Sequence, residues 1–75
     1  MHRLTETIAI KICTLEGRTT KYLPPTEAVE FIIYYCKANG MWIYLDGRNV
    51  SYDRLNAAML KQAKNIVLAE VVVGG

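Results

Sequence analysis

The sequence predicts an α+β fold, in which a mixed sheet of four to five strands packs on one main helix and a second short helix precedes the last strand. Three observations indicate this fold: two strand patterns open the chain, an amphipathic stretch follows them, and a nearly continuous apolar run occupies residues 66–73. The chain has 75 residues and an apolar content of 52%, which suffices for one compact core. We therefore expect a single domain over residues 1–75, with a flexible tail from about residue 73.

The first two strands are expected at residues 7–13 and 18–23. In TIAIKIC, Ile8, Ile10 and Ile12 recur at every second position while Lys11 faces the opposite side, which is the pattern of a half-buried strand. Gly17 then provides a turn, and RTTKYL is rich in the Thr and Tyr residues that strands favour. The opening is therefore predicted to be an antiparallel β-hairpin.

The main helix is expected to begin at Thr26, which we interpret as its N-cap, after two prolines that end the preceding strand. Gly40 suits the position that follows a helix C-terminus. One broad apolar stripe at helical spacing comprises Ala28, Val29, Ile32, Ile33 and Cys36. We expect this stripe to lie on the sheet.

The second half of the chain predicts a short hairpin, a short helix and a closing strand. Residues 41–45 and 48–50 read as a strand and its partner, with the turn at Asp46 and Gly47. YDRLNAAMLKQAKN favours a short helix, with either Ser51 or Asp53 as its cap. IVLAEVVV is typical of a strand buried on both faces in the middle of a sheet. The alternative is a ferredoxin-like split βαβ arrangement, which requires the second helix to be a full crossover.

Composition argues against several classes of partner and site. The net charge of +2 comes without clustered Lys and Arg, so we expect no nucleic-acid partner. No apolar stretch approaches the roughly 20 residues that cross a bilayer, and we see no signal-peptide core, so we expect a cytoplasmic protein with no membrane partner. His2 and the two cysteines have none of the usual zinc spacings. We interpret Cys13 and Cys36 as core residues in a reducing compartment, and a redox or persulfide role is the alternative.

The order of elements, followed by Gly74 and Gly75, resembles that of the ubiquitin-like β-grasp proteins, and most of all their bacterial sulfur-carrier branch, the ThiS and MoaD family. The similarity lies in residues 42–75: WIYLDGRNVSYDRL is similar to a strand and turn of that family, and NIVLAEVVVGG to its closing strand and tail. In the first half only the element order agrees. QAKN at residues 62–65 differs from the acidic, glycine-containing turn usual in sulfur carriers, so the pathway stays open.

The resemblance implies a carrier and co-substrate, and not an enzyme. A ThiF- or MoeB-like enzyme would use ATP to adenylate the carboxylate of Gly75, with Gly74 completing the adenylation and thiocarboxylate site, and no cofactor or metal would be bound. The thiocarboxylate would then donate sulfur to a synthase of thiamine-type or molybdopterin-type cofactor biosynthesis. The free chain is expected to be a monomer.

Glycine suits such a site because a residue without a Cβ passes through a narrow channel and adopts φ values closed to other residues. Other interpretations of Gly74 and Gly75 stay open. The chain could be a ubiquitin-like modifier that is conjugated to lysines through Gly75, or a β-grasp interaction module in which the two glycines are an ordinary frayed end.

Aromatic residues are more numerous than one small core holds, which predicts a docking patch on the open face of the sheet. We expect this patch to include Tyr44 and Arg48, with Val71 and Val73 beside them. Lys61 and Lys64 would complete its basic rim. The alternative is that the rings lie at the edge of the core, which we favour for Tyr34 or Tyr35 on the helix.

Overall fold

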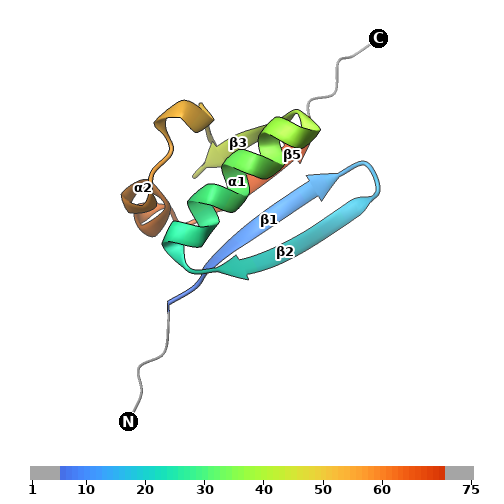
Figure 1. The fold of residues 1–75 in the computed structure, drawn as a ribbon. Coiled ribbons are helices and arrows are strands. Elements are labelled where there is room, and N and C mark those ends of the chain that lie inside the picture. The colour runs from blue at the N-terminus through green and yellow to red at the C-terminus, as the bar shows by residue number, and fades with distance from the viewer. Residues whose placement is uncertain (1–5, 71–75) are drawn as a thin grey trace.

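The computed structural model describes residues 6–70, which form a five-stranded sheet with one main helix across one of its faces (Figure 1). The strands are β1 (Ile8–Thr14), β2 (Gly17–Leu23), β3 (Met41–Leu45), β4 (Arg48–Val50) and β5 (Ile66–Glu70). The helices are α1 (Pro25–Asn39), the 3₁₀ turn η1 (Tyr52–Arg54) and α2 (Ala57–Gln62). The predicted α+β class is confirmed, and the arrangement is that of a β-grasp fold.

The last described strand lies at the centre of the sheet, whose order is β2-β1-β5-β3-β4. β5 pairs in parallel with β1 and antiparallel with β3, and β1 and β2 form the predicted antiparallel hairpin. α2 has six residues and is no full crossover, so the ferredoxin-like alternative is wrong. The expectation that the closing strand is central is confirmed.

The ends of α1 correct one expectation and confirm another. Thr26 is not the N-cap: the helix begins at Pro25, and Pro24 precedes it without a side-chain cap. Proline is suited to the first helical position because the N–H that it lacks has no intrahelical partner there. Gly40 ends the helix as predicted, in the left-handed conformation with φ of 63°, and its N–H donates to the carbonyl of Cys36.

The core lies between α1 and the face of the sheet that this helix covers. Its buried residues are Ile10 and Ile12 of β1, Ala28, Ile32 and Cys36 of α1, Met41, Ile43 and Leu45 of β3, Leu55 and Leu60 around α2, and Ile66 and Leu68 of β5. Val29 and Ile33 of the predicted helix stripe are half-buried against this cluster. The alternation of isoleucines in β1 therefore identified the buried face of that strand correctly.

β5 is buried on one face and not on both. Ile66 and Leu68 are buried under the helix, whereas Val67 and Ala69 on the opposite face are only half-buried. The prediction of burial on both faces is wrong because α1 covers a single face of the sheet. The continuous apolar run instead supplies one face to the core and one to the open side.

The predicted second helix is two short pieces joined at the buried Leu55. Ser51 caps η1, since its hydroxyl accepts a hydrogen bond from the N–H of Asp53 at 3.3 Å. The cap of α2 is Asn56, whose Oδ1 accepts from the N–H of Met59 at 2.9 Å. The expectation that Ser51 or Asp53 caps the second helix is therefore wrong for α2, whereas Ser51 does cap the preceding turn η1. No helix within residues 6–70 is long and apolar enough to cross a membrane.

Candidate functional site

Four of the predicted site residues, Val71, Val73, Gly74 and Gly75, lie outside the described residues. The last described residue is Glu70, at the C-terminal end of β5. The end of β5, the C-terminal end of α1 and the β1–β2 turn lie at the same end of the molecule (Figure 1). This end is therefore the part of the fold from which the chain continues toward the two glycines.

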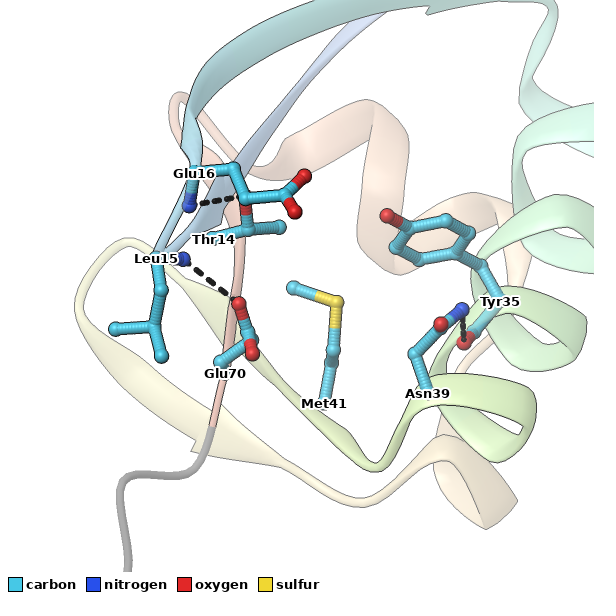
Figure 2. Close-up of a pocket in the computed structure, with 7 residues that line it drawn as sticks. All are labelled: Thr14, Leu15, Glu16, Tyr35, Asn39, Met41 and Glu70. Atoms are coloured by element: carbon cyan, nitrogen blue, oxygen red, sulfur yellow. Dashed lines mark hydrogen bonds between the residues drawn. The ribbon is translucent and has the colours of Figure 1, made fainter.

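A pocket lies beside the end of β5 (Figure 2). It has a volume of about 340 Å³ and is lined by Thr14, Leu15, Glu16, Tyr35, Asn39, Met41 and Glu70, which we call the β5-end pocket. Two carboxylates, a phenol ring and a thioether thus face the same space. The lining comes from the β1–β2 turn, from α1 and from the adjoining ends of β3 and β5.

Glu70 ties the end of β5 to the β1–β2 turn. The backbone N–H of Leu15 donates a hydrogen bond of 2.7 Å to Oε1 of Glu70, across 55 positions of sequence (Figure 2). The parallel register of β1 and β5 ends one residue earlier, at the pair Cys13 and Ala69. On the other side, β3 continues to pair with β5 as far as Met41 and Glu70. The Glu70 side chain therefore provides the link to the hairpin beyond the last backbone pair.

The turn that receives this hydrogen bond is held by its own side chain. Thr14 Oγ1 accepts from the N–H of Glu16 at 3.2 Å and donates to the carbonyl of Gly17 at 3.3 Å. Leu15 lies between these contacts with its side chain 82% exposed. The local bonds of Thr14 thus leave the Leu15 N–H directed to Glu70.

Across the pocket, Tyr35 forms the α1 wall. Its ring stacks on that of Phe31 with 5.3 Å between centroids, and its carbonyl accepts a hydrogen bond of 2.9 Å from the Asn39 side-chain amide. Lys21 Nζ lies 5.1 Å from the centroid of the Phe31 ring. Tyr35 is half-buried and Tyr34 is 75% exposed, so Tyr35 is the helix ring at the core edge.

An aromatic and aliphatic surface follows β5 on the open face of the sheet. Trp42 lies opposite Ala69 and Tyr44 opposite Val67 in the β3–β5 register, and the two aromatic rings are 6.3 Å apart between centroids. Trp42 is 49% exposed and Tyr44 is half-buried. We call these four residues the open-face patch. Trp42 was not among the residues named for the expected docking patch. Its position between the buried Met41 and Ile43 was nevertheless a signal that it faces the open side of the sheet.

Two residues of the expected basic rim, Arg48 and Lys61, do not lie beside Tyr44. Arg48 lies opposite the buried Leu45 in the β3–β4 register, so it belongs to the helix side of the sheet, where it lines a hollow with Met59 of α2. Lys61 lines a different hollow, with Pro25 and residues at the start of β1. Tyr44 and Arg48 are therefore on opposite faces.

Basic residues of the open face come from the first hairpin instead. Lys11 of β1 pairs with Val67, and Arg18 of β2 pairs with Cys13, which in turn pairs with Ala69. The position of Lys11 opposite the isoleucines of β1 was the available signal for this placement. Sequence spacing alone did not reveal that β1 lies next to β5.

Asp46 fixes the start of β5. Its Oδ1 accepts hydrogen bonds from the N–H groups of Lys64 at 2.9 Å and Asn65 at 2.8 Å, and its own N–H donates to the Asn65 carbonyl. Asp46 and Gly47 both have positive φ, 51° and 85°, as a tight hairpin turn requires. The interpretation of Asp46 as a turn residue is confirmed.

The two cysteines lie in different surroundings. Cys36 is buried in the core, and removal from water raises the pKa of its thiol from 9.0 to about 11. Cys13 is half-buried on the open face. The interpretation of Cys36 as a core residue is confirmed, whereas Cys13 lies outside the core.

Within residues 6–70, no three His, Cys, Asp or Glu side chains are grouped so that they could hold a metal ion. Comparison of the chain with protein-family models gives no match, and a search of curated proteins gives no significant one.

Proposed function

We propose that the protein is a sulfur carrier, in which an ATP-dependent enzyme adenylates the carboxylate of Gly75 and a sulfur nucleophile then converts it to a thiocarboxylate. One observation carries the proposal. β5 is the central strand of a β-grasp sheet, held between β1 and β3, and the sequence VVVGG follows it directly. The segment with the two glycines thus follows the central strand of the sheet, which is paired on both sides.

The chemistry requires little of the carrier except presentation. A carboxylate oxygen of Gly75 attacks the α-phosphorus of ATP and pyrophosphate leaves, which gives an acyl adenylate. Sulfide then attacks the acyl carbon and forms a carbon–sulfur bond, the bond from that carbon to the phosphate oxygen breaks, and AMP leaves with the electron pair, so that a thiocarboxylate remains. Both steps take place in the active site of the partner. The protein itself only carries the sulfur atom, as group-carrier cofactors carry an acyl group.

Gly74 and Gly75 suit this presentation because no Cβ obstructs the approach of the backbone to the nucleotide. Residues 72–75 span roughly 13 Å when fully extended, at about 3.3 Å per residue. That length suffices for the carboxylate to enter a cleft while the folded domain stays outside it.

The open-face patch is the docking surface in this proposal. Trp42 is half exposed beside Tyr44, and both lie against β5. Aromatic residues of this kind contribute strongly to protein interfaces because they bury a large area with few rotatable bonds. An adenylating enzyme that contacts Trp42 and Tyr44 would hold β5 next to its own surface. This surface does not distinguish whether the sulfur is delivered to a cofactor of thiamine type or of molybdopterin type.

Deletion of Gly75 tests the proposed function. With a ThiF- or MoeB-like adenylating enzyme from the same organism, the intact chain is expected to support ATP–pyrophosphate exchange, and the chain without Gly75 is not. The buried residues of the described core lie between Ile10 and Leu68, so we expect the unfolding free energy to be unchanged when Gly75 alone is removed. Exchange retained without Gly75 would contradict the proposal.

A further inference from the structure

The geometry points to Glu70 as a positioning residue: through its hydrogen bond to the N–H of Leu15, it fixes the position of the last described residue of β5, from which the sequence continues into residues 71–75. This inference rests on the proposed function, since positioning matters only if Gly75 must reach a partner's active site. It assigns a role to a side chain that spacing in the sequence does not single out.

The end of β5 would otherwise be held on one side only. β3 pairs with β5 up to Glu70, whereas β1 pairs with it only up to Ala69, because β1 then turns into the hairpin. The hydrogen bond of 2.7 Å from Leu15 to Glu70 replaces the missing backbone pair on the β1 side. A carboxylate acceptor makes this bond stronger than one between neutral groups.

The acceptor and the donor are both placed in advance. Glu70 lies on the central strand, and the Thr14 side chain bonds to the backbone of Glu16 and Gly17, the two residues that follow Leu15. Forming the link therefore orders few additional groups. Figure 2 shows the Glu70 carboxylate directed to the Leu15 nitrogen and the Glu16 carboxylate directed across the pocket toward Tyr35.

Loss of the link would affect binding before chemistry. If the end of β5 is held only by β3, it loses more conformational entropy when the segment after it enters a cleft. This entropic cost weakens association with the partner. Once the tail is bound, the reacting carboxylate is in the same place. We therefore expect KM for the carrier to rise while kcat stays unchanged.

Three matched variants separate the hydrogen bond from the charge: Glu70→Ala, Glu70→Gln and Glu16→Ala. Glu70→Gln keeps an oxygen that accepts from Leu15 but removes the charge. Glu16→Ala removes a second carboxylate of the same pocket whose side chain makes no hydrogen bond within residues 6–70. Steady-state ATP–pyrophosphate exchange gives kcat and KM, hydrogen exchange of the Leu15 amide reports the bond itself, and thermal unfolding verifies that each variant is folded.

For Glu70→Ala we expect KM to rise about tenfold at constant kcat, together with faster exchange of the Leu15 amide. Glu70→Gln and Glu16→Ala should stay within about twofold of the unmodified chain. Unchanged KM in Glu70→Ala overturns the inference. Equal losses in all three variants also overturn it, and would assign the pocket's negative charge to a cationic group of the partner. If the unmodified chain supports no exchange, the proposed function itself fails, and the role of Glu70 fails with it.

Discussion

Asp46 is the residue whose carboxylate connects the β3–β4 turn to the start of β5, through the N–H groups of Lys64 and Asn65. Substitution by alanine removes this acceptor. It also leaves at φ of 51° a residue that has a Cβ but no polar side chain to form a local hydrogen bond, which makes this left-handed conformation unfavourable. We expect Asp46→Ala to lower the unfolding free energy by roughly 2 kcal/mol, which urea denaturation measures.

Two variants serve as controls for Asp46. Asp46→Asn keeps a side-chain oxygen and tolerates positive φ, so its loss should be less than about 1 kcal/mol. Asp53→Ala removes an exposed carboxylate that makes no side-chain hydrogen bond among the described residues, and its effect should be within about 0.5 kcal/mol. If Asp46→Ala were as stable as Asp53→Ala, the assigned role of Asp46 would be wrong.

Cys36 links stability to alkaline pH. Burial raises the pKa of its thiol from 9.0 to about 11, so the folded state holds the proton more tightly than the unfolded state does. The stabilisation is complete below pH 9 and declines as the pH rises toward 11. We expect a loss of roughly 2 kcal/mol across this window, measured as the unfolding free energy at several pH values.

Cys36→Ala isolates the thiol from the other groups that titrate in this range. The variant starts from a lower stability because it leaves a small cavity, but its decline between pH 9 and 11 should be shallower than that of the unmodified chain. Identical slopes for the two proteins would show that Cys36 is not the group responsible.

At the scale of elements, β5 is asymmetric: one face belongs to the core and the other to the open-face patch. Leu68 is fully buried and Val67, its neighbour, is half-buried. We expect Leu68→Ala to cost about 3 kcal/mol and Val67→Ala about 1 kcal/mol of unfolding free energy. Denaturation of both variants measures the difference, and equal losses would mean that both faces are covered in solution.

Most elements were predictable because their signals are local. The alternating isoleucines of β1, the Asp46 turn and Gly40 at the end of α1 each depend on residues within a few positions, and the structure has them where the sequence indicated. The errors at Thr26 and at the cap of α2 concern helix starts, where several neighbouring residues are chemically suitable. Only the packed structure selects among them.

The candidate site was less predictable because it depends on strand neighbours. Tyr44 and Arg48 are four positions apart, but the β3–β4 hairpin places them on opposite faces of the sheet. Glu70 contacts Leu15, which is distant in the sequence, and no local pattern indicates that contact. The register that joins β1, β5 and β3 is a property of the whole fold.

In the whole molecule, each level of the structure supports the next. The core beneath α1 holds the sheet, the sheet holds β5 at its centre, and the open-face patch and Glu70 flank the strand that leads to the two glycines. In the proposed function, the rest of the chain serves to present residues 71–75 to a partner's active site.

Intact mass spectrometry of the chain purified from its native source tests this central claim most directly. We predict a form that ends at Gly75 and is heavier than the unmodified chain by the difference between sulfur and oxygen, with the extra mass located on the C-terminal peptide. A chain found only in its unmodified form, a chain that extends past Gly75, or a series of covalent conjugates to other proteins through Gly75 would contradict the sulfur-carrier proposal.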